Sequence, residues 1–458
     1  MPPLWRHLPA FLTTIASSLL LASVASASDP ALPPTERYAP DAPLKPYIPA
    51  GEPVDPAQVS TLSLNALLVY ADRHSPRIES ARARAATVDA ERQRARIFFP
   101  DNPELSLGLG PQRSAEGGGT ELEIALEQRF EIAGEPGLRR RAAADRQRLA
   151  EAGVDDVRWE VHVETHRLFV DVLLAEERTQ QAEQFVAFAR TLRDIASRQV
   201  EAGELSPLNL LVAEADLAQT GEVLIEARQG AEALRTQLAA EIGWPTLKLP
   251  PIHGELPPIV AAPELDTLLA SMAHHHPSVR MRELAVSAGH SQLRLQEREA
   301  WPEPTLGLVF GQESGPGADA TARTLMVQLS VGLPLWHRNQ EGRARARAEL
   351  ELADRQRDAT IIALRQRLTD ATHALNAAVE RVGLYESEVV PQLEQNLSLL
   401  QRAYELGEVD IHQVSQTRER LLQVTRQHLD ARQTYYESAA LLEGLVGTNI
   451  WPLHEETP

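Results

Sequence analysis

The hydrophobic residues of this chain follow two different periods. Four segments alternate apolar and polar residues in steps of two, which is the pattern of a β-strand with one apolar face. In the first of them, Leu105, Leu107 and Leu109 share a face. The predicted strands cover residues about 103–110, 120–132, 304–312 and 323–335.

The other period, of three and four residues, is typical of helices. Two predicted helices, at about 138–201 and 339–406, have over sixty residues each. At 1.5 Å per residue each would be about 95–100 Å long. Apolar positions in the first, such as Val161, Leu168 and Val172, have coiled-coil spacing. Shorter helices are predicted at about 76–99, 206–242, 277–300 and 409–446.

The same order of elements occurs twice, about 200 residues apart. The segment that begins at His74 aligns with the segment that begins at His276, and Pro103 then pairs with Pro304. A proline-rich segment, expected to be a linker or a belt on the surface, precedes each half. The expected parts are a signal peptide (1–27), a proline-rich segment (28–56), a first repeat (57–244), a proline-rich linker (245–263), a second repeat (264–447) and a tail (448–458).

The N-terminal residues have the features of a secretory signal. A basic Arg6 precedes an apolar stretch over Leu8–Leu21, and small residues follow at Ala25 and Ala27. This pattern predicts cleavage after Ala27, and an uncleaved membrane anchor is the less favoured alternative because the apolar stretch is short.

Four strands are too few to close into a barrel, because about eight is the smallest closed set. Left open, a sheet with one apolar face would expose unpaired edges and invite aggregation. Three copies of the chain would supply twelve strands and close a pore, and the long helices would then continue it as a tunnel.

Composition narrows the chemistry that the chain can perform. The absence of cysteine excludes thiol catalysis, disulfides and cysteine metal ligands. With 64 acidic against 45 basic residues the formal net charge is −19, which makes nucleic acid a poor partner. The sequence contains no HExxH, P-loop, GxGxxG or GxSxG signature, and nothing singles out a catalytic pair among the acids. We therefore expect no enzyme activity and no cofactor.

Several stretches of the chain together resemble the TolC-like outer-membrane efflux proteins, and within them the CzcC-like heavy-metal efflux branch. The resemblance rests on the duplicated strand–loop–strand unit and on NPELSLGLG, EQRFEIAGEPGLRRRAA, LPLWHRNQEGRARARAE, EAGELSPLNLL and YELGEVDIHQV. It implies an α+β membrane protein that forms a homotrimer. A twelve-stranded β-barrel would lie in the outer membrane of a Gram-negative bacterium, and an α-helical coiled-coil barrel would continue it into the periplasm.

The resemblance also implies partners and contact sites. The protein would dock onto a periplasmic membrane-fusion adaptor of a tripartite system with an inner-membrane RND pump, and would itself be a passive duct. Its two helix–helix turns would form the docking tips, where the glycines also suit a left-handed helix C-cap. The tip residues are Gly203, Glu204, Leu205, Gly407, Glu408 and Val409.

The periplasmic mouth departs from that pattern. TolC relatives constrict this mouth with acidic side chains, whereas Gln413 and Gln416 stand here, with Asp410 nearer the turn. His412 is a candidate for contact with metal at the entrance. How the mouth closes is left open.

Four glutamates lie opposite the apolar stripe of the second predicted strand, and threefold symmetry would place up to twelve carboxylates on one surface. They are either a solvated polar face or a source of cation preference. These lumen-facing candidates are Glu121, Glu123, Glu127 and Glu131. The run His274–His276 could touch a metal ion, but a polar turn before Pro277 is favoured, and no metal site is predicted.

The favoured function is an outer-membrane channel that conducts divalent heavy-metal cations such as cobalt, zinc or cadmium. A drug or solvent duct of the same fold is the alternative, because a duct selects little. A periplasmic coiled-coil scaffold would have no use for strands with an apolar face, and a hydrolase would need a compact core and a pocket.

Overall fold

The computed structural model describes residues 55–56, 60–114, 117–246, 248–314, 321–406, 408–409 and 411–449. The predicted signal peptide and the end of the predicted tail lie outside these residues. The first repeat comprises α1 (Leu64–His74), α2 (Pro76–Arg96), β1 (Glu104–Ser114), β2 (Gly117–Arg129), α3 (Glu135–Glu201) and α4 (Pro207–Ile242). The second comprises α5 (Leu265–His275), α6 (Pro277–Arg298), β3 (Pro304–Ser314), β4 (Thr321–Val331), α7 (Gln340–Leu384), η1 (Tyr385–Val389), α8 (Val390–Glu405) and α9 (Ile411–Val446).

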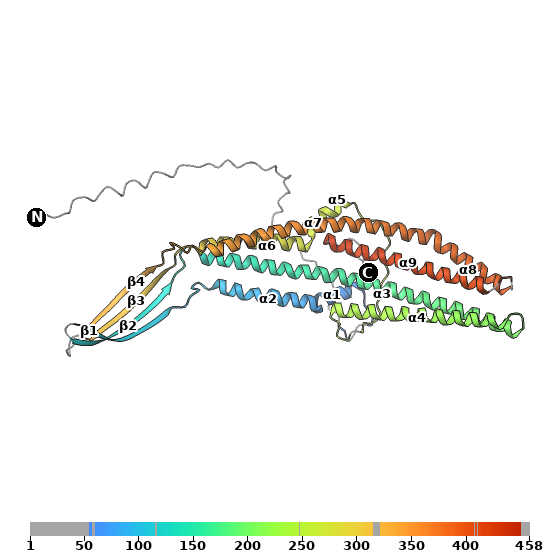
Figure 1. The fold of residues 1–458 in the computed structure, drawn as a ribbon, viewed down its shortest axis with the longest axis horizontal. Coiled ribbons are helices and arrows are strands. Elements are labelled where there is room, and N and C mark those ends of the chain that lie inside the picture. Colours follow the sequence, from blue (N-terminus) through green and yellow to red (C-terminus); the bar gives the residue numbers. More distant parts are fainter. Residues whose placement is uncertain are drawn as a thin grey trace. The chain divides into compact units, whose positions relative to one another are not determined.

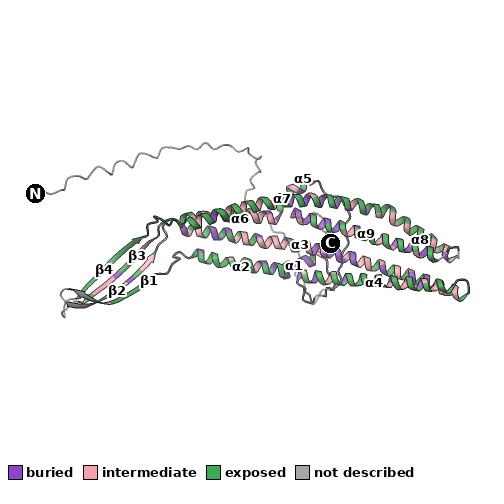
Figure 2. Ribbon diagram, in the orientation of Figure 1, coloured by how far each residue is buried: buried purple, intermediate pink, exposed green. Residues whose placement is uncertain are grey.

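The strands form one antiparallel sheet in the order β1-β2-β3-β4 (Figure 1). Its register brings the apolar residues of all four strands to one face: Leu107 is opposite Ile124, Ile124 is opposite Phe310, and Phe310 is opposite Leu325. Leu107 and Leu325 are 69% and 75% exposed, and exposure runs along both outer strands in Figure 2. One chain therefore presents a continuous apolar surface that no other part of the described residues covers.

The long helix of the first repeat is unbroken, and its 67 residues make α3 about 100 Å long. The corresponding segment of the second repeat, predicted as one helix over 339–406, is helical from Gln340 to Glu405 but changes its winding part-way. A π-helical turn at Tyr385–Val389 separates α7 from α8. Pro391 lies two residues after the last residue of this turn. Because proline lacks the N–H that a regular helix would use and its ring crowds the preceding turn, a local change of helical winding is expected there.

Each short helix predicted before a strand pair is preceded by another, so that α1 and α2, and likewise α5 and α6, meet at a break. Proline starts the second helix of each pair, at Pro76 and Pro277. Proline suits the first helical turn, where its missing N–H would have no helical partner anyway. The strand β4 ends at Val331, four residues before the predicted 335, and Leu333 and Leu335 are exposed beyond it.

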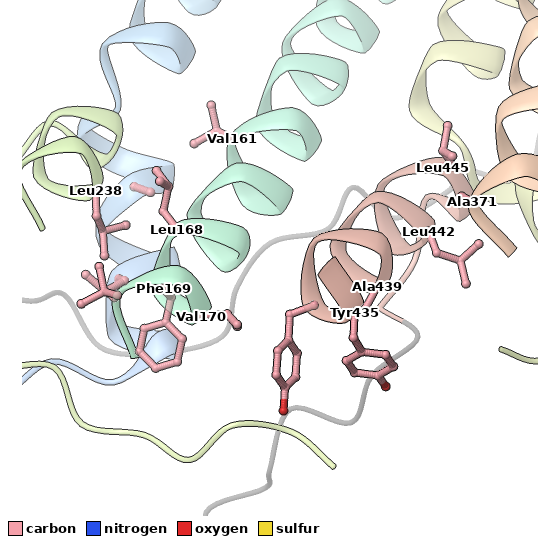
Figure 3. Packing of buried hydrophobic residues seen from close by; sticks show 14 of the residues in the cluster. Val161, Leu168, Phe169, Val170, Leu238, Ala371, Tyr435, Ala439, Leu442 and Leu445 are labelled. Carbon is pink, nitrogen blue, oxygen red and sulfur yellow. The ribbon is translucent and has the colours of Figure 1, made fainter. Parts of the chain in front are cut away.

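The main hydrophobic core lies between helices of the two repeats. Figure 3 shows Leu168 of α3, Leu238 of α4, and Tyr435 and Leu442 of α9 within it, and all four side chains are fully buried. Burying a leucine side chain contributes roughly 1.5–3 kcal/mol. The proline-rich linker packs on the outside of this core. The amide of Val260 in the linker donates a 2.9 Å hydrogen bond to Tyr435 Oη.

Among the described residues, no helix is both long enough and apolar enough to cross a membrane.

Candidate channel-lining and docking surfaces

The second face of the sheet carries a row of carboxylates on β2. We call Glu121, Glu123 and Glu127 the acidic row. The sheet register places Glu123 between Gly108 and Gly311 on the neighbouring strands. A methyl group at Gly108 would lie at an ordinary contact distance, 3.7 Å, from the Glu123 Cβ. The structure thus gathers the acidic row on one face, opposite the apolar surface.

The fourth predicted lumen acid, Glu131, does not belong to this row. The strand β2 ends at Arg129, and Glu131 lies in the turn that leads to α3. Its side chain is 10% exposed and forms an ion pair with Arg139. The prediction was wrong because it extended the alternation of the strand beyond the point where β-pairing stops.

Two further acids share the face of the acidic row and were missed. Glu104 of β1 is opposite Glu127, and Glu313 of β3 is opposite Glu121. The alternation of the sequence could have identified both, because each is the direct neighbour of a residue on the apolar face. Glu104 precedes Leu105, and Glu313 follows Gln312, which is opposite Leu122. The acidic face therefore extends over β1, β2 and β3.

The turn between α3 and α4 has the geometry that its glycine predicts. Gly203 adopts φ 75°, and its amide donates a 3.0 Å hydrogen bond to the carbonyl of Val200. Ser206 then caps α4 by accepting a hydrogen bond from the Leu208 amide. Glu204 is exposed beside the glycine. The turn is thus closed by backbone hydrogen bonds and presents the Glu204 carboxylate at its surface.

The corresponding turn of the second repeat is described only in part, because Gly407 and Asp410 lie outside the described residues. Glu408 is exposed, and its amide donates a 2.9 Å hydrogen bond to the carbonyl of Ala403. Val409 packs against the smaller hydrophobic cluster that lies near both turns.

The mouth candidates lie on the first turns of α9. His412, Gln413 and Gln416 are all exposed there, whereas Val414 between them is fully buried. The polar side chains therefore share the open side of α9 at this end.

A buried ion pair close to these turns joins the two repeats, and sequence reasoning missed it. Arg418 of α9 is 4% exposed and donates hydrogen bonds to Asp216 and to Thr220 Oγ1 of α4, the latter at 2.6 Å. Burial raises the pKa of Asp216, and the Arg418 charge opposes that rise. We call this ion pair the clasp, because it joins α4 and α9, the helices that begin after the two turns. Nothing in the local sequence indicates that Arg418 and Asp216, which are 202 positions apart, contact each other.

The run His274–His276 does not gather around one point. His274 and His275 are exposed, whereas His276 is buried and its Nδ1 accepts a 3.1 Å hydrogen bond from the Ser278 amide. Burial lowers the pKa of His276 to about 4. His276 therefore acts as the N-terminal cap of α6.

Comparison with known proteins agrees with this architecture. Residues 268–448 match the outer membrane efflux protein family. The cobalt-zinc-cadmium resistance protein CzcC of Cupriavidus metallidurans is 23% identical over 397 residues, which are 86% of this chain and 92% of that protein. The structure of CusC superimposes with a TM-score of 0.68 at 14% identity, over 88% of this chain and 98% of CusC. The outer membrane channel CmeC of Campylobacter jejuni gives a TM-score of 0.67 at 14% identity, over 84% of this chain and 85% of CmeC.

These findings confirm the resemblance to the TolC-like efflux proteins and the predicted fold. The matched family is described as outer membrane efflux protein, which agrees with the predicted outer-membrane location and with efflux as the general function. The similarity to a family of efflux proteins and to the channel structures of CusC and CmeC agrees with the expectation that the chain is not an enzyme.

Proposed function

We propose, on the premise that this chain is a relative of the outer-membrane efflux channels, that three copies form a passive duct through the outer membrane. The observation that carries the proposal is the common apolar face of the four strands. β1 and β4 are the outer strands of the sheet, and each would pair with a neighbouring copy. Twelve strands closed in this way would leave no free edge and would turn the apolar face toward lipid.

The acidic row would then line the lumen three times over. Carboxylates gathered in a narrow aqueous passage attract cations and repel anions, and the effect weakens as salt rises. Glycines on both neighbouring strands support this role, because they place no side chain directly beside Glu123.

The turn at Gly203 and its counterpart in the second repeat would contact a periplasmic membrane-fusion adaptor, and an inner-membrane RND pump would supply the energy. The exposed, hydrogen-bonded turn at Gly203 supports such a contact. The clasp between Arg418 and Asp216 lies close to the same end and would hold the two helical hairpins together while the mouth is closed.

The cargo that we propose is a divalent heavy-metal cation. The similarity to a cobalt-zinc-cadmium resistance protein and the acidic face both support it. Neither depends on the other, since the first comes from the whole chain and the second from one face of the sheet.

Deletion of the gene tests the function and the cargo together. The deletion strain is titrated with cobalt, zinc and cadmium salts and, in parallel, with drugs and organic solvents, and the intact gene is returned as the control. We expect the strain to become sensitive to metals and the intact gene to restore resistance. Sensitivity to drugs alone would refute the metal assignment but retain the duct, and unchanged tolerance to every compound would count against both.

A further inference from the structure

A compact group of two histidines and one glutamate connects α3 of the first repeat to α9 of the second. His162 and His166 are four residues apart on α3 and therefore lie on one side of that helix. Glu443 reaches them from α9. The three side chains are 4%, 10% and 3% exposed, so the group lies inside the protein rather than on a surface.

The spacing of the three side chains is close to that of a metal site. Glu443 Oε2 is 3.1 Å from His166 Nδ1, and Oε1 is 3.7 Å from His162 Nε2. One nitrogen or oxygen from each residue lies within 4.8 Å of the others. A tetrahedral zinc ion with bonds of about 2.0–2.1 Å holds its ligand atoms roughly 3.3–3.4 Å apart. Small changes of side-chain rotamer would bring all three onto one ion.

Neighbouring residues fix this geometry. The ring of Trp159 stacks on His162 with centroids 5.1 Å apart, and Trp159 Nε1 donates a 2.9 Å hydrogen bond to the carbonyl of Gly444. A methyl group at Gly444 would lie 3.1 Å from Val163, so glycine permits the close approach of the two helices beside Glu443. Such supporting contacts orient metal ligands and raise affinity.

A small cavity beside the group offers room for a fourth ligand. It has a volume of about 20 Å³ and is bordered by His166, Glu443 and Tyr436. That volume is enough for one water molecule with polar partners. Two imidazoles, one carboxylate and one water make a four-coordinate set that suits a divalent transition metal.

We infer that His162, His166 and Glu443 bind one divalent first-row transition metal ion, such as Zn²⁺ or Co²⁺, with a water molecule as the fourth ligand. The ion ties α3 to α9 and so fixes the two repeats against each other. Because its ligands are closed to solvent, it is a resident structural ion and not cargo in transit. The inference is independent of which substrate the duct carries.

Cobalt titration of the purified, detergent-solubilised protein tests this site after metal has been removed with a chelator. We expect visible ligand-field bands of four-coordinate Co²⁺ that reach saturation at one ion per chain and disappear when Zn²⁺ is added. The melting temperature of the protein should rise when either ion is added. The same titration is run on Glu443→Gln and His166→Gln, which nearly preserve side-chain size. We expect at least about a 10- to 100-fold loss of affinity in each.

The matched control is the double variant His274→Ala/His275→Ala, which removes two exposed imidazoles outside the group. Its titration should be unchanged. Circular dichroism without metal shows whether each variant is folded, and the titration of the unaltered protein stands whether or not a variant folds. Absence of a saturable cobalt signal, equal affinity in Glu443→Gln, or loss of binding in the control would each overturn the site.

Discussion

Replacing Val327 by arginine tests which face of the sheet meets lipid. Val327 lies near the middle of β4, is 71% exposed, and is opposite Leu308 in the apolar face. An arginine near the bilayer midplane of an outer-membrane barrel costs about 2–4 kcal/mol. At 1.4 kcal/mol per decade this lowers the ratio of folded to unfolded chain about 30- to 700-fold. Three copies would accumulate roughly 6–12 kcal/mol in a trimer.

The neighbouring residue provides a matched control. Gln328 is the next position of the same strand but lies on the opposite face, opposite Gly307 and in the same cross-strand row as Glu127. Gln328→Arg should change stability by less than about 1 kcal/mol. The assay is the amount of heat-resistant trimer in the outer-membrane fraction, followed by urea unfolding from lipid vesicles. Equal loss in both variants, or a larger loss in Gln328→Arg, would refute the assignment of the faces.

Other variants address the remaining sites. Gly203→Val should cost at least about 1–2 kcal/mol at the left-handed turn and reduce recovery of the adaptor in a pull-down, and full recovery would contradict the docking role. Glutamine at all three positions of the acidic row should lower the cation-to-anion permeability ratio in planar bilayers, and an unchanged ratio would dismiss electrostatic selection. Arg418→Met should cost about 3 kcal/mol by leaving Asp216 unpaired, and Arg418→Met/Asp216→Leu should recover most of it in thermal unfolding; no recovery would contradict the clasp. The pKa of His276 is about 4 in the folded protein, below its value of about 6.5 in the unfolded chain. Neutral His276 therefore contributes up to about 3 kcal/mol to the free energy of unfolding above pH 6.5, and this contribution is lost as pH falls toward 4. His276→Asn, which retains a capping acceptor, should flatten that pH dependence in urea unfolding, and an unaltered profile would dismiss the role of His276.

The faces of the strands could be predicted because side chains alternate strictly along a strand. Leu107 and Ile124 belong to the same apolar face whatever the exact ends of their strands. The ends themselves depend on where pairing stops, which is why Glu131 was assigned to a strand that ends at Arg129. The period of a strand thus predicts its orientation but not its length.

Long-range contacts were beyond the reach of the sequence. The clasp of Arg418 with Asp216 spans 202 positions, and Glu443 meets His166 across 277. The spacing of His162 and His166 marks one helix face, but only the packing of α9 on α3 supplies the third side chain. The π-helical turn was also missed, although Pro391 gave a local signal for it.

The closed barrel of three chains is the central claim, and the mass of the purified complex tests it most directly. Native mass spectrometry of the detergent-solubilised protein should give a single species with three copies of the mature chain. A stable monomer or dimer that still conducts ions in planar bilayers would contradict the account, because one or two sheets of four strands would then have to form the pore.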